Sequence, residues 1–185
     1  MSQHKNQIQT FYSIWLRPTT ASAEKIQIVI DELAEKYKSP RFDCHLTILA
    51  GMSLESNEIS QVQDKLADSV QLMSPFKIKS LALTQLNEKY RALFMEFANE
   101  GEILNLRNWA CESFTYNESR HFVPHISLIY AYLDNKVKIN IKDTLRERLP
   151  AEVTFDRMEL REYSETADFW RPMGAPCLFT GNHDP

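Results

Sequence analysis

Glycine is scarce in this chain of 185 residues, with four copies, at positions 51, 101, 174 and 181. Their spacing excludes the glycine-rich loops that cradle phosphates in P-loop and dinucleotide-binding proteins. The three cysteines, Cys44, Cys111 and Cys177, are too few and too scattered for a disulfide framework. No run of 18 apolar residues predicts a transmembrane helix, and the N-terminus lacks the apolar segment of a secretory signal. We therefore expect a cytoplasmic protein that does not contact a membrane.

Positive charge is in deficit, since 21 Lys and Arg face 25 Asp and Glu, for a formal net charge of −4. Sequence-independent binding of long nucleic acid requires many cations to neutralise phosphates, so we do not expect it here. A small anionic ligand needs only a few local donors and is compatible with this balance. The length predicts roughly one domain, and the 43 % apolar and 25 % charged residues are typical of a globular protein. We expect a monomer.

Apolar periodicity predicts a mixture of strands and helices, which defines an α+β fold class. Alternating or continuous short apolar runs predict strands, at 11–16, 44–50, 76–86, 91–98, 125–132, 152–163 and 176–180. Apolar residues at helical spacing predict helices, at 22–38, 56–73, 101–116 and 136–148. Ser22 is the expected N-cap of the first helix.

The order strand, helix, strand, helix, strand occurs twice, at about 11–86 and 91–163, which indicates an internal repeat. His45 and His125 are 80 residues apart, and the starts of the two opening strands have the same separation. The two closing strands carry apolar residues at the same four offsets, with a change of phase in mid-strand that is typical of a β-bulge. We expect a single domain over 1–185, built from two related lobes about a pseudo-two-fold axis.

The two halves are most alike around their histidines. The first motif is Arg41-Phe42-Asp43-Cys44-His45-Leu46-Thr47-Ile48, and the second is His121-Phe122-Val123-Pro124-His125-Ile126-Ser127-Leu128. Residues i and i+2 of a strand share a face, so each histidine shares its face with the hydroxyl of Thr47 or Ser127. One such histidine would more often be structural. Two at matched positions predict an acid and a base for displacement at phosphorus, with hydroxyls as donors to the phosphate oxygens.

Other site chemistries are disfavoured by the residues around these motifs. Two histidines on separate strands, without carboxylates or thiols alongside, fall short of the usual metal-ligand count, so we expect neither a metal nor another cofactor. The nucleophile motif G-x-S-x-G of serine hydrolases does not occur. Cys44 alternates away from His45 along the strand, so its thiol is expected to face the core.

The tetrapeptides His45-Leu46-Thr47-Ile48 and His125-Ile126-Ser127-Leu128 resemble the H-x-T/S-h signature of the 2H phosphoesterase superfamily, where h is apolar. Within that superfamily the chain looks most like the small cyclic phosphodiesterases of plant and fungal type, over roughly 11–180. The resemblance implies a two-lobed fold, with mainly antiparallel sheets lining a central cleft and helices outside. It also implies metal-independent hydrolysis of a small cyclic phosphate to a phosphomonoester.

Substrates of this group include nucleoside 2′,3′-cyclic phosphates and ADP-ribose 1″,2″-cyclic phosphate, a by-product of tRNA splicing. The resemblance implies that His45 and His125 act as general acid and base, and that Thr47 and Ser127 hold the phosphate. We prefer His125 as the base and His45 as the acid. The reverse stays open because the motifs are nearly symmetric.

Three aromatic residues, Tyr130, Trp15 and Trp170, are implied to flank this site. Each has a plainer interpretation, since a tryptophan in a strand is often a core residue, and Tyr130 is at an odd offset from His125. Arg41 and His121 each lie four residues before a motif histidine. They are either solvated residues at the rim or the holders of a second phosphate, such as the diphosphate of ADP-ribose.

Two other functions are compatible with the sequence. One is an enzyme of RNA ends, either a 2′,3′-cyclic phosphodiesterase or a 2′-5′ RNA ligase-like enzyme, which would bind RNA in a salt-dependent manner. The other is a nucleotide-binding module without turnover, although intact histidine and hydroxyl pairs in both halves argue against it.

Overall fold

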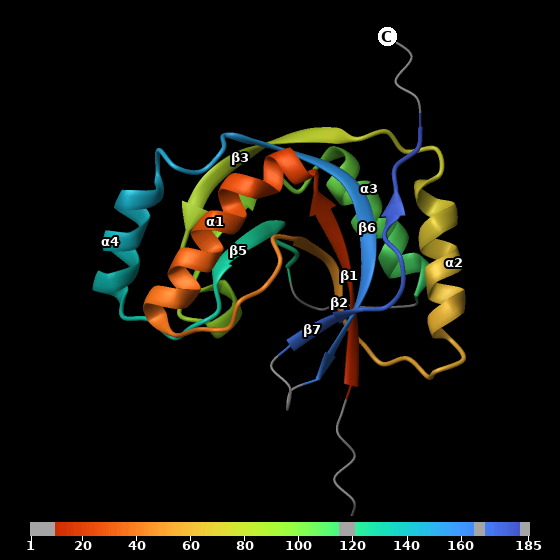
Figure 1. Ribbon diagram of the computed structural model, residues 1–185. Helices are drawn as coiled ribbons and strands as arrows, with labels where there is room; N and C mark the ends of the chain where they lie inside the picture. Colours follow the sequence, from red (N-terminus) through yellow and green to blue (C-terminus); the bar gives the residue numbers. More distant parts are fainter. Residues whose placement is uncertain (1–9, 115–120, 165–168, 182–185) are drawn as a thin grey trace, which may run out of the picture.

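The structure, a computed structural model, describes residues 10–114, 121–164 and 169–181. Its strands (Figure 1) are β1 (Thr10–Pro18), β2 (Leu46–Met52), β3 (Phe76–Thr84), β4 (Leu93–Phe97), β5 (His125–Ile129), β6 (Glu152–Ser164), β7 (Phe169–Pro172) and β8 (Cys177–Leu178). Its helices are α1 (Thr20–Tyr37), α2 (Ile59–Val70), α3 (Gly101–Ser113) and α4 (Asn135–Leu145), with a short 3-10 helix η1 (Lys89–Arg91). Every predicted element forms, and β7 is an additional strand. Residues 115–116 of the third predicted helix lie outside the described residues.

The strands pair antiparallel and close into a barrel in the order β1-β2-β5-β4-β3-β6, because β6 also pairs with β1. Strands β7 and β8 add to β6. The order is symmetric about the β2–β5 pair, since the third strand of each predicted repeat lies beside the opening strand of the other repeat. The expected α+β class with an antiparallel sheet is confirmed. Each side of the barrel nevertheless takes strands from both halves of the chain.

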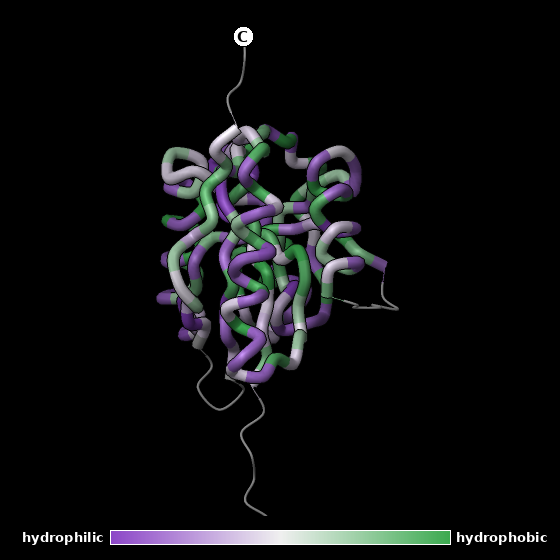
Figure 2. The backbone as a smooth tube through the Cα atoms, turned by 90° about the vertical axis from the view of Figure 1, so that its right-hand side faces the viewer, coloured by the Kyte–Doolittle hydropathy of each residue, from purple (hydrophilic) through white to green (hydrophobic). Residues whose placement is uncertain are grey.

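The helices lie outside the barrel, and helices of one half of the chain pack against strands of the other half. Helices α1 and α4 lie on one side and α2 and α3 on the other (Figure 1). Helix α1 of the first half packs against β5 of the second, and α3 of the second half packs against β2 of the first. Hydrophilic and hydrophobic residues alternate along the backbone (Figure 2), as expected for elements with one buried face. This exchange makes the two halves of the chain depend on each other for their cores.

The start of α1 differs from the prediction. Its N-cap is Thr19, whose side chain accepts a hydrogen bond from the backbone N–H of Ser22 at 3.2 Å. Ser22 therefore lies in the first turn, and its hydroxyl accepts from the backbone N–H of Thr154 at 3.0 Å. Both residues have the short hydroxyl side chain that favours a cap, so composition alone did not separate them.

The predicted mid-strand bulges are present, but they sit at different offsets in the two closing strands. In β6 the register against β1 shifts between Phe155 and Arg157. In β3 the register against β4 shifts between Ser80 and Ala82, and the intervening Leu81 is 62 % exposed. Leu81 has the same offset in the repeated apolar pattern as the fully buried Met158 of β6, so the matched apolar residues of the two closing strands differ in burial.

The closure of the barrel depends on Phe155, which is fully buried where β6 leaves β3 and joins β1. We expect Phe155→Ala to lower the free energy of unfolding by about 3–5 kcal/mol, because it leaves a cavity in the core. Urea unfolding measures this loss. Leu72→Ala, at a side chain 93 % exposed, is the control and should change stability by less than about 0.5 kcal/mol. Equal effects of the two variants would contradict this account of the core.

Candidate active site

The two histidine motifs meet where β2 pairs with β5. Leu46 pairs antiparallel with Ile126, and both side chains are fully buried in the core. In an antiparallel register the residue before one partner lies opposite the residue after the other. The histidine of each motif therefore lies opposite the hydroxyl residue of the other motif, on the face that points away from the core. This pairing gathers two imidazoles and two hydroxyls at one point.

All four side chains line one cavity of about 330 Å³. Its other walls are mainly aromatic and carry no Lys, Arg, Asp or Glu. The lining residues are Phe11, Ser13, His45, Thr47, Ala50, Gly51, Tyr90, His125, Ser127, Tyr130, Tyr163 and Trp170. We call this the central cavity.

His45 is held on three sides and is 5 % exposed. Its Nδ1 lies 2.6 Å from the backbone carbonyl of Asp43, and its ring stacks on Trp15 with centroids 3.4 Å apart. A carbonyl only accepts hydrogen bonds, so Nδ1 carries the proton and Nε2 has a lone pair. The hydroxyl of Tyr130 lies 3.4 Å from this Nε2.

His125 is held in a matching way. Its Nδ1 lies 2.7 Å from the carbonyl of Val123, again two residues earlier in the chain, and this contact also leaves Nε2 unprotonated. Phe94 contacts the ring edge-to-face at a centroid distance of 5.1 Å. Phe94 pairs with Ser127 across β4 and β5, just as Trp15 pairs with Thr47 across β1 and β2. The same strand position thus supplies an aromatic ring to each histidine.

Burial lowers the pKa of both histidines, because removing an imidazolium from water is costly. For His45 the pKa falls to about 3, and nearby positive charge on Arg17 adds to the effect of burial. For His125 burial is again the main cause, and the positive charge of Arg91 lowers the pKa further, while the Val123 carbonyl and the carboxylates of Glu88 and Glu96 favour the charged form. Both imidazoles are therefore neutral near pH 7.

A cluster of charged residues lies behind His45. The carboxylate of Asp43 accepts from Arg17 at 3.2 Å and from Arg161 at 3.0 Å. The guanidinium of Arg161 also lies 4.8 Å from the ring centre of Trp15. Arg161 is thus linked to His45 by two routes, through the residue whose carbonyl binds Nδ1 and through the indole on which the ring stacks.

The two hydroxyls differ in their surroundings. The Ser127 hydroxyl donates to the backbone carbonyl of Tyr90 at 2.6 Å, so its single proton is already engaged. Within the ranges that the structure describes, the Thr47 side chain has no hydrogen-bond partner. Thr47 is therefore the hydroxyl that is free to donate to a ligand in the cavity.

The aromatic residues predicted to flank the site take different positions. Tyr130 lines the central cavity in spite of its odd offset, because β5 ends at Ile129. Trp170 also lines it, whereas Trp15 is 1 % exposed and supports His45 from behind. Arg41 is not among the lining residues. Its exposed guanidinium lies 3.6 Å from Glu35, at the edge of a neighbouring hollow.

Two tyrosines in the site were missed by the sequence analysis. The hydroxyls of Tyr90 and Tyr163 lie 2.8 Å apart, and both residues line the central cavity. Tyr90 is in η1 and Tyr163 is near the end of β6, where its ring stacks on Trp170. Neither residue belongs to a recognisable motif, so only the closed barrel reveals that they meet.

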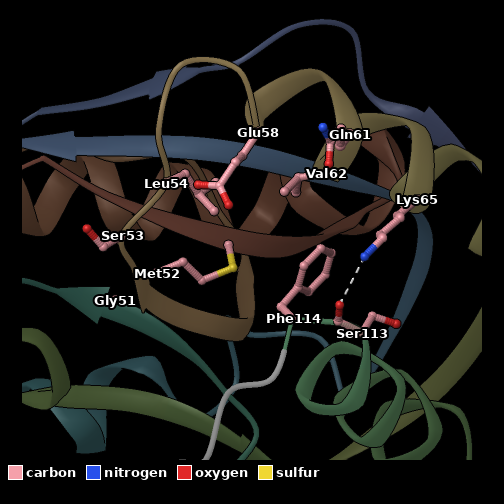
Figure 3. A pocket seen from close by; sticks show the side chains of 10 residues that line it. All are labelled: Gly51, Met52, Ser53, Leu54, Glu58, Gln61, Val62, Lys65, Ser113 and Phe114. Atoms are coloured by element: carbon pink, nitrogen blue, oxygen red, sulfur yellow. Dashed lines mark hydrogen bonds between the residues drawn. The ribbon is translucent and has the colours of Figure 1, made fainter.

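A different hollow, also of about 330 Å³, lies beside the end of β2 and is bounded by α2 and the end of α3 (Figure 3). Lys65 reaches across it and donates to the carbonyl of Ser113 at 3.2 Å. It contains neither motif histidine. In the described part of the chain no three metal-binding side chains gather at one place. None of the helices described is long and apolar enough to cross a bilayer.

Comparisons with known proteins agree with this geometry. The chain is 20 % identical, over 132 residues and 71 % of each sequence, to a cyclic phosphodiesterase of Arabidopsis thaliana. Its fold is similar to E. coli LigT complexed with 3'-AMP, with a TM-score of 0.55, 17 % identity, and coverage of 89 % of this chain and 93 % of that one. It is also similar to the protein TT0787 of Thermus thermophilus, with a TM-score of 0.56, 17 % identity, and coverage of 94 % and 99 %.

A family model, described as the 2'-5' RNA ligase superfamily, matches residues 14–167, which include both histidine motifs. The match spans most of the chain and therefore covers both halves of the predicted repeat. The chain belongs to the 2'-5' RNA ligase superfamily, the 2H phosphoesterases, and the expectation of an enzyme that acts on phosphodiester bonds is confirmed.

Proposed function

We propose that this protein hydrolyses a small cyclic phosphate, either a nucleoside 2′,3′-cyclic phosphate or ADP-ribose 1″,2″-cyclic phosphate, to a phosphomonoester without a metal ion. One observation carries the proposal. Two imidazoles, each with Nδ1 fixed by a backbone carbonyl, line one cavity in which each lies opposite a hydroxyl residue. The similarity to a plant cyclic phosphodiesterase supports a cyclic phosphodiester as the substrate, and the 3'-AMP complex of LigT supports a nucleotide.

The reaction needs one base and one acid. The base removes a proton from water, whose oxygen forms a new bond to phosphorus, while the bond from phosphorus to one ring oxygen breaks. The acid gives its proton to that leaving oxygen, so charge and protons balance. Thr47 donates to a non-bridging oxygen, where negative charge grows. Ser127 first has to turn its proton away from the Tyr90 carbonyl.

The surroundings of the histidines favour a division of roles. His45 is the more strongly desolvated ring and lies near Arg17 and Arg161, so it is suited to act as the neutral base. His125 is less completely buried, and Glu88 and Glu96 oppose the positive charge of Arg91 there, so of the two rings it is better suited to carry the proton and act as the acid. This assignment reverses the one that we preferred from the sequence, which had no information on burial or on nearby charge.

The central cavity also favours a small substrate. Its volume of about 330 Å³ is at the lower end of the range typical for ligand pockets. The rings of Tyr90, Tyr163 and Trp170 offer faces for a base or a ribose, and its uncharged lining limits attraction to the phosphate itself. These features suit one nucleotide unit, with recognition by stacking and shape.

Turnover of adenosine 2′,3′-cyclic phosphate and of ADP-ribose 1″,2″-cyclic phosphate, measured by product analysis in EDTA, tests this proposal. We expect His45→Ala and His125→Ala each to lower kcat by about 10²–10⁴-fold, because each removes one proton-transfer partner. Lys142→Gln, on α4, is the control and should retain activity. Near-normal turnover in His125→Ala, or strong inhibition by EDTA, would refute the mechanism. Binding without turnover would favour a binding module, and turnover only on RNA with a cyclic end would favour an enzyme of RNA ends.

The free hydroxyl of Thr47 leads to a second expectation. Thr47→Val keeps the shape of the side chain but removes its donor, and we expect kcat to fall by about 10²-fold with little change in KM. Steady-state kinetics separates the two parameters, and the urea unfolding curve shows whether the variant folds normally. An unchanged kcat in a folded Thr47→Val protein would mean that this hydroxyl does not stabilise the transition state.

The lowered pKa values also predict the pH dependence. The free enzyme needs one neutral and one protonated imidazole, and the pKa values of both lie below the ordinary 6.5. As pH rises past the lowered pKa of the acid, the acid loses its proton and kcat/KM should fall, and as pH drops toward 3 the base gains one. We expect a bell-shaped profile with its maximum below pH 6.5. A maximum above pH 7.5 would contradict this expectation. NMR titration of variants that lack either His45 or His125 shows which histidine causes the fall in kcat/KM on each side of the maximum.

A further inference from the structure

Formal charge is distributed unevenly around the central cavity. The hollow beside Trp15 and Trp170 has two cations and two anions, which are Arg41, Arg161, Asp31 and Asp43. The hollow beyond His125 has three cations, a histidine and one carboxylate, which are Lys89, Arg91, Arg107, His121 and Glu88. Arg91 is paired with Glu88 at 2.8 Å, so the excess positive charge comes from Lys89 and Arg107. In a chain with a net charge of −4, this second hollow is therefore a local concentration of positive charge.

This positive hollow, which we call the η1 groove, opens directly onto the reacting groups. It has a volume of about 640 Å³ and shares four lining residues with the central cavity, namely Thr47, Ala50, Tyr90 and His125. Its walls come from the β3–β4 connection that contains η1, from α3 and from the segment before β5. A ligand with one phosphate between the histidines can therefore extend past His125 into this groove.

The cations of the η1 groove are held in place by the fold. Arg107 is 7 % exposed, donates to the carbonyl of Ile48 at 2.6 Å and lies 4.8 Å from the ring centre of Phe122. The ammonium of Lys89 lies 5.2 Å from the ring centre of Tyr90. Fixed cations next to an aromatic wall give up little conformational freedom when an anion binds, which favours recognition of phosphate.

We infer that the η1 groove binds a second phosphate group of the substrate, so that the enzyme prefers nucleotides with a phosphate in addition to the cyclic one. The inference rests on the proposed function and adds a specificity site to it. It also gives different roles to His121 and Arg41, which occupy the same position relative to the two motif histidines in the sequence. His121 lines the positive groove, whereas Arg41 lies at the balanced hollow on the opposite side, beside Asp43 and Arg161.

The test compares two substrates that differ in one phosphate, adenosine 2′,3′-cyclic phosphate with a free or a phosphorylated 5′-hydroxyl. We expect kcat/KM to be about tenfold higher for the phosphorylated substrate, the effect of one charge-assisted contact at a partly exposed site. The preference should shrink as salt rises from about 0.05 to 0.5 M, because screening weakens exposed charges. Equal kcat/KM values for the two substrates at low salt would overturn the inference.

Variants locate the preference in the groove. In Lys89→Gln/His121→Gln, kcat/KM for the phosphorylated substrate should fall about tenfold toward that of the other substrate. The control Lys142→Gln should keep the full preference, since Lys142 lines a separate hollow near β3. Loss of the preference in Arg41→Gln, with the double variant unaffected, would assign the second phosphate to the other hollow and overturn the inference.

Failure of the proposed function can be told apart from failure of this inference. If neither of these substrates nor ADP-ribose 1″,2″-cyclic phosphate is turned over, the proposed function is wrong, and calorimetry with the same two nucleotides still tests the groove. Tighter binding of the 5′-phosphorylated nucleotide, weakened in Lys89→Gln/His121→Gln, supports the second phosphate site. Equal binding of both nucleotides overturns it.

Discussion

The site of this protein depends on one contact in its sheet, the antiparallel pairing of Leu46 with Ile126. These two residues are buried, and the side-chain alternation of a strand turns the residues on either side of them toward the cavity. A slip of one residue would bury both histidines in the core and expose the leucine and the isoleucine. Because the hydrophobic core opposes that slip, it fixes the register that brings the two motifs together.

Burial gives the two imidazoles their chemical state as well as their position. The stack of His45 on Trp15 removes water from one face of the ring, and the Asp43 carbonyl determines which nitrogen carries the proton. Arg161 fixes both of these neighbours, so it acts on His45 as a positioning residue without reaching the cavity lining. The imidazole is therefore kept neutral, with its Nε2 lone pair available to accept a proton.

The sequence predicted the elements and the four central side chains because both follow from local patterns. Apolar spacing depends on secondary structure, and the repeated motifs place His45 and His125 on the same face as a hydroxyl. The pairing of β3 with β4 and of β6 with β1 could not be predicted, because the apolar pattern of a strand does not depend on which strand it pairs with. The same holds for β7, a short strand that forms only against the end of β6. Tyr90 and Tyr163 meet only because the barrel closes, so no spacing could reveal them.

A duplicated frame with two similar motifs would give two equivalent histidines, yet acid–base catalysis needs them to differ. The difference comes from residues that the repeat does not match. Beside the first motif, Arg17 and Arg161 accompany a deeply buried ring, whereas beside the second, Glu88 and Glu96 oppose the positive charge of Arg91. The cations of the η1 groove also lie on the second side alone. The symmetric pairing of the strands thus brings the two motifs together, and in the proposed mechanism the unmatched surroundings on each side would give each histidine its own role.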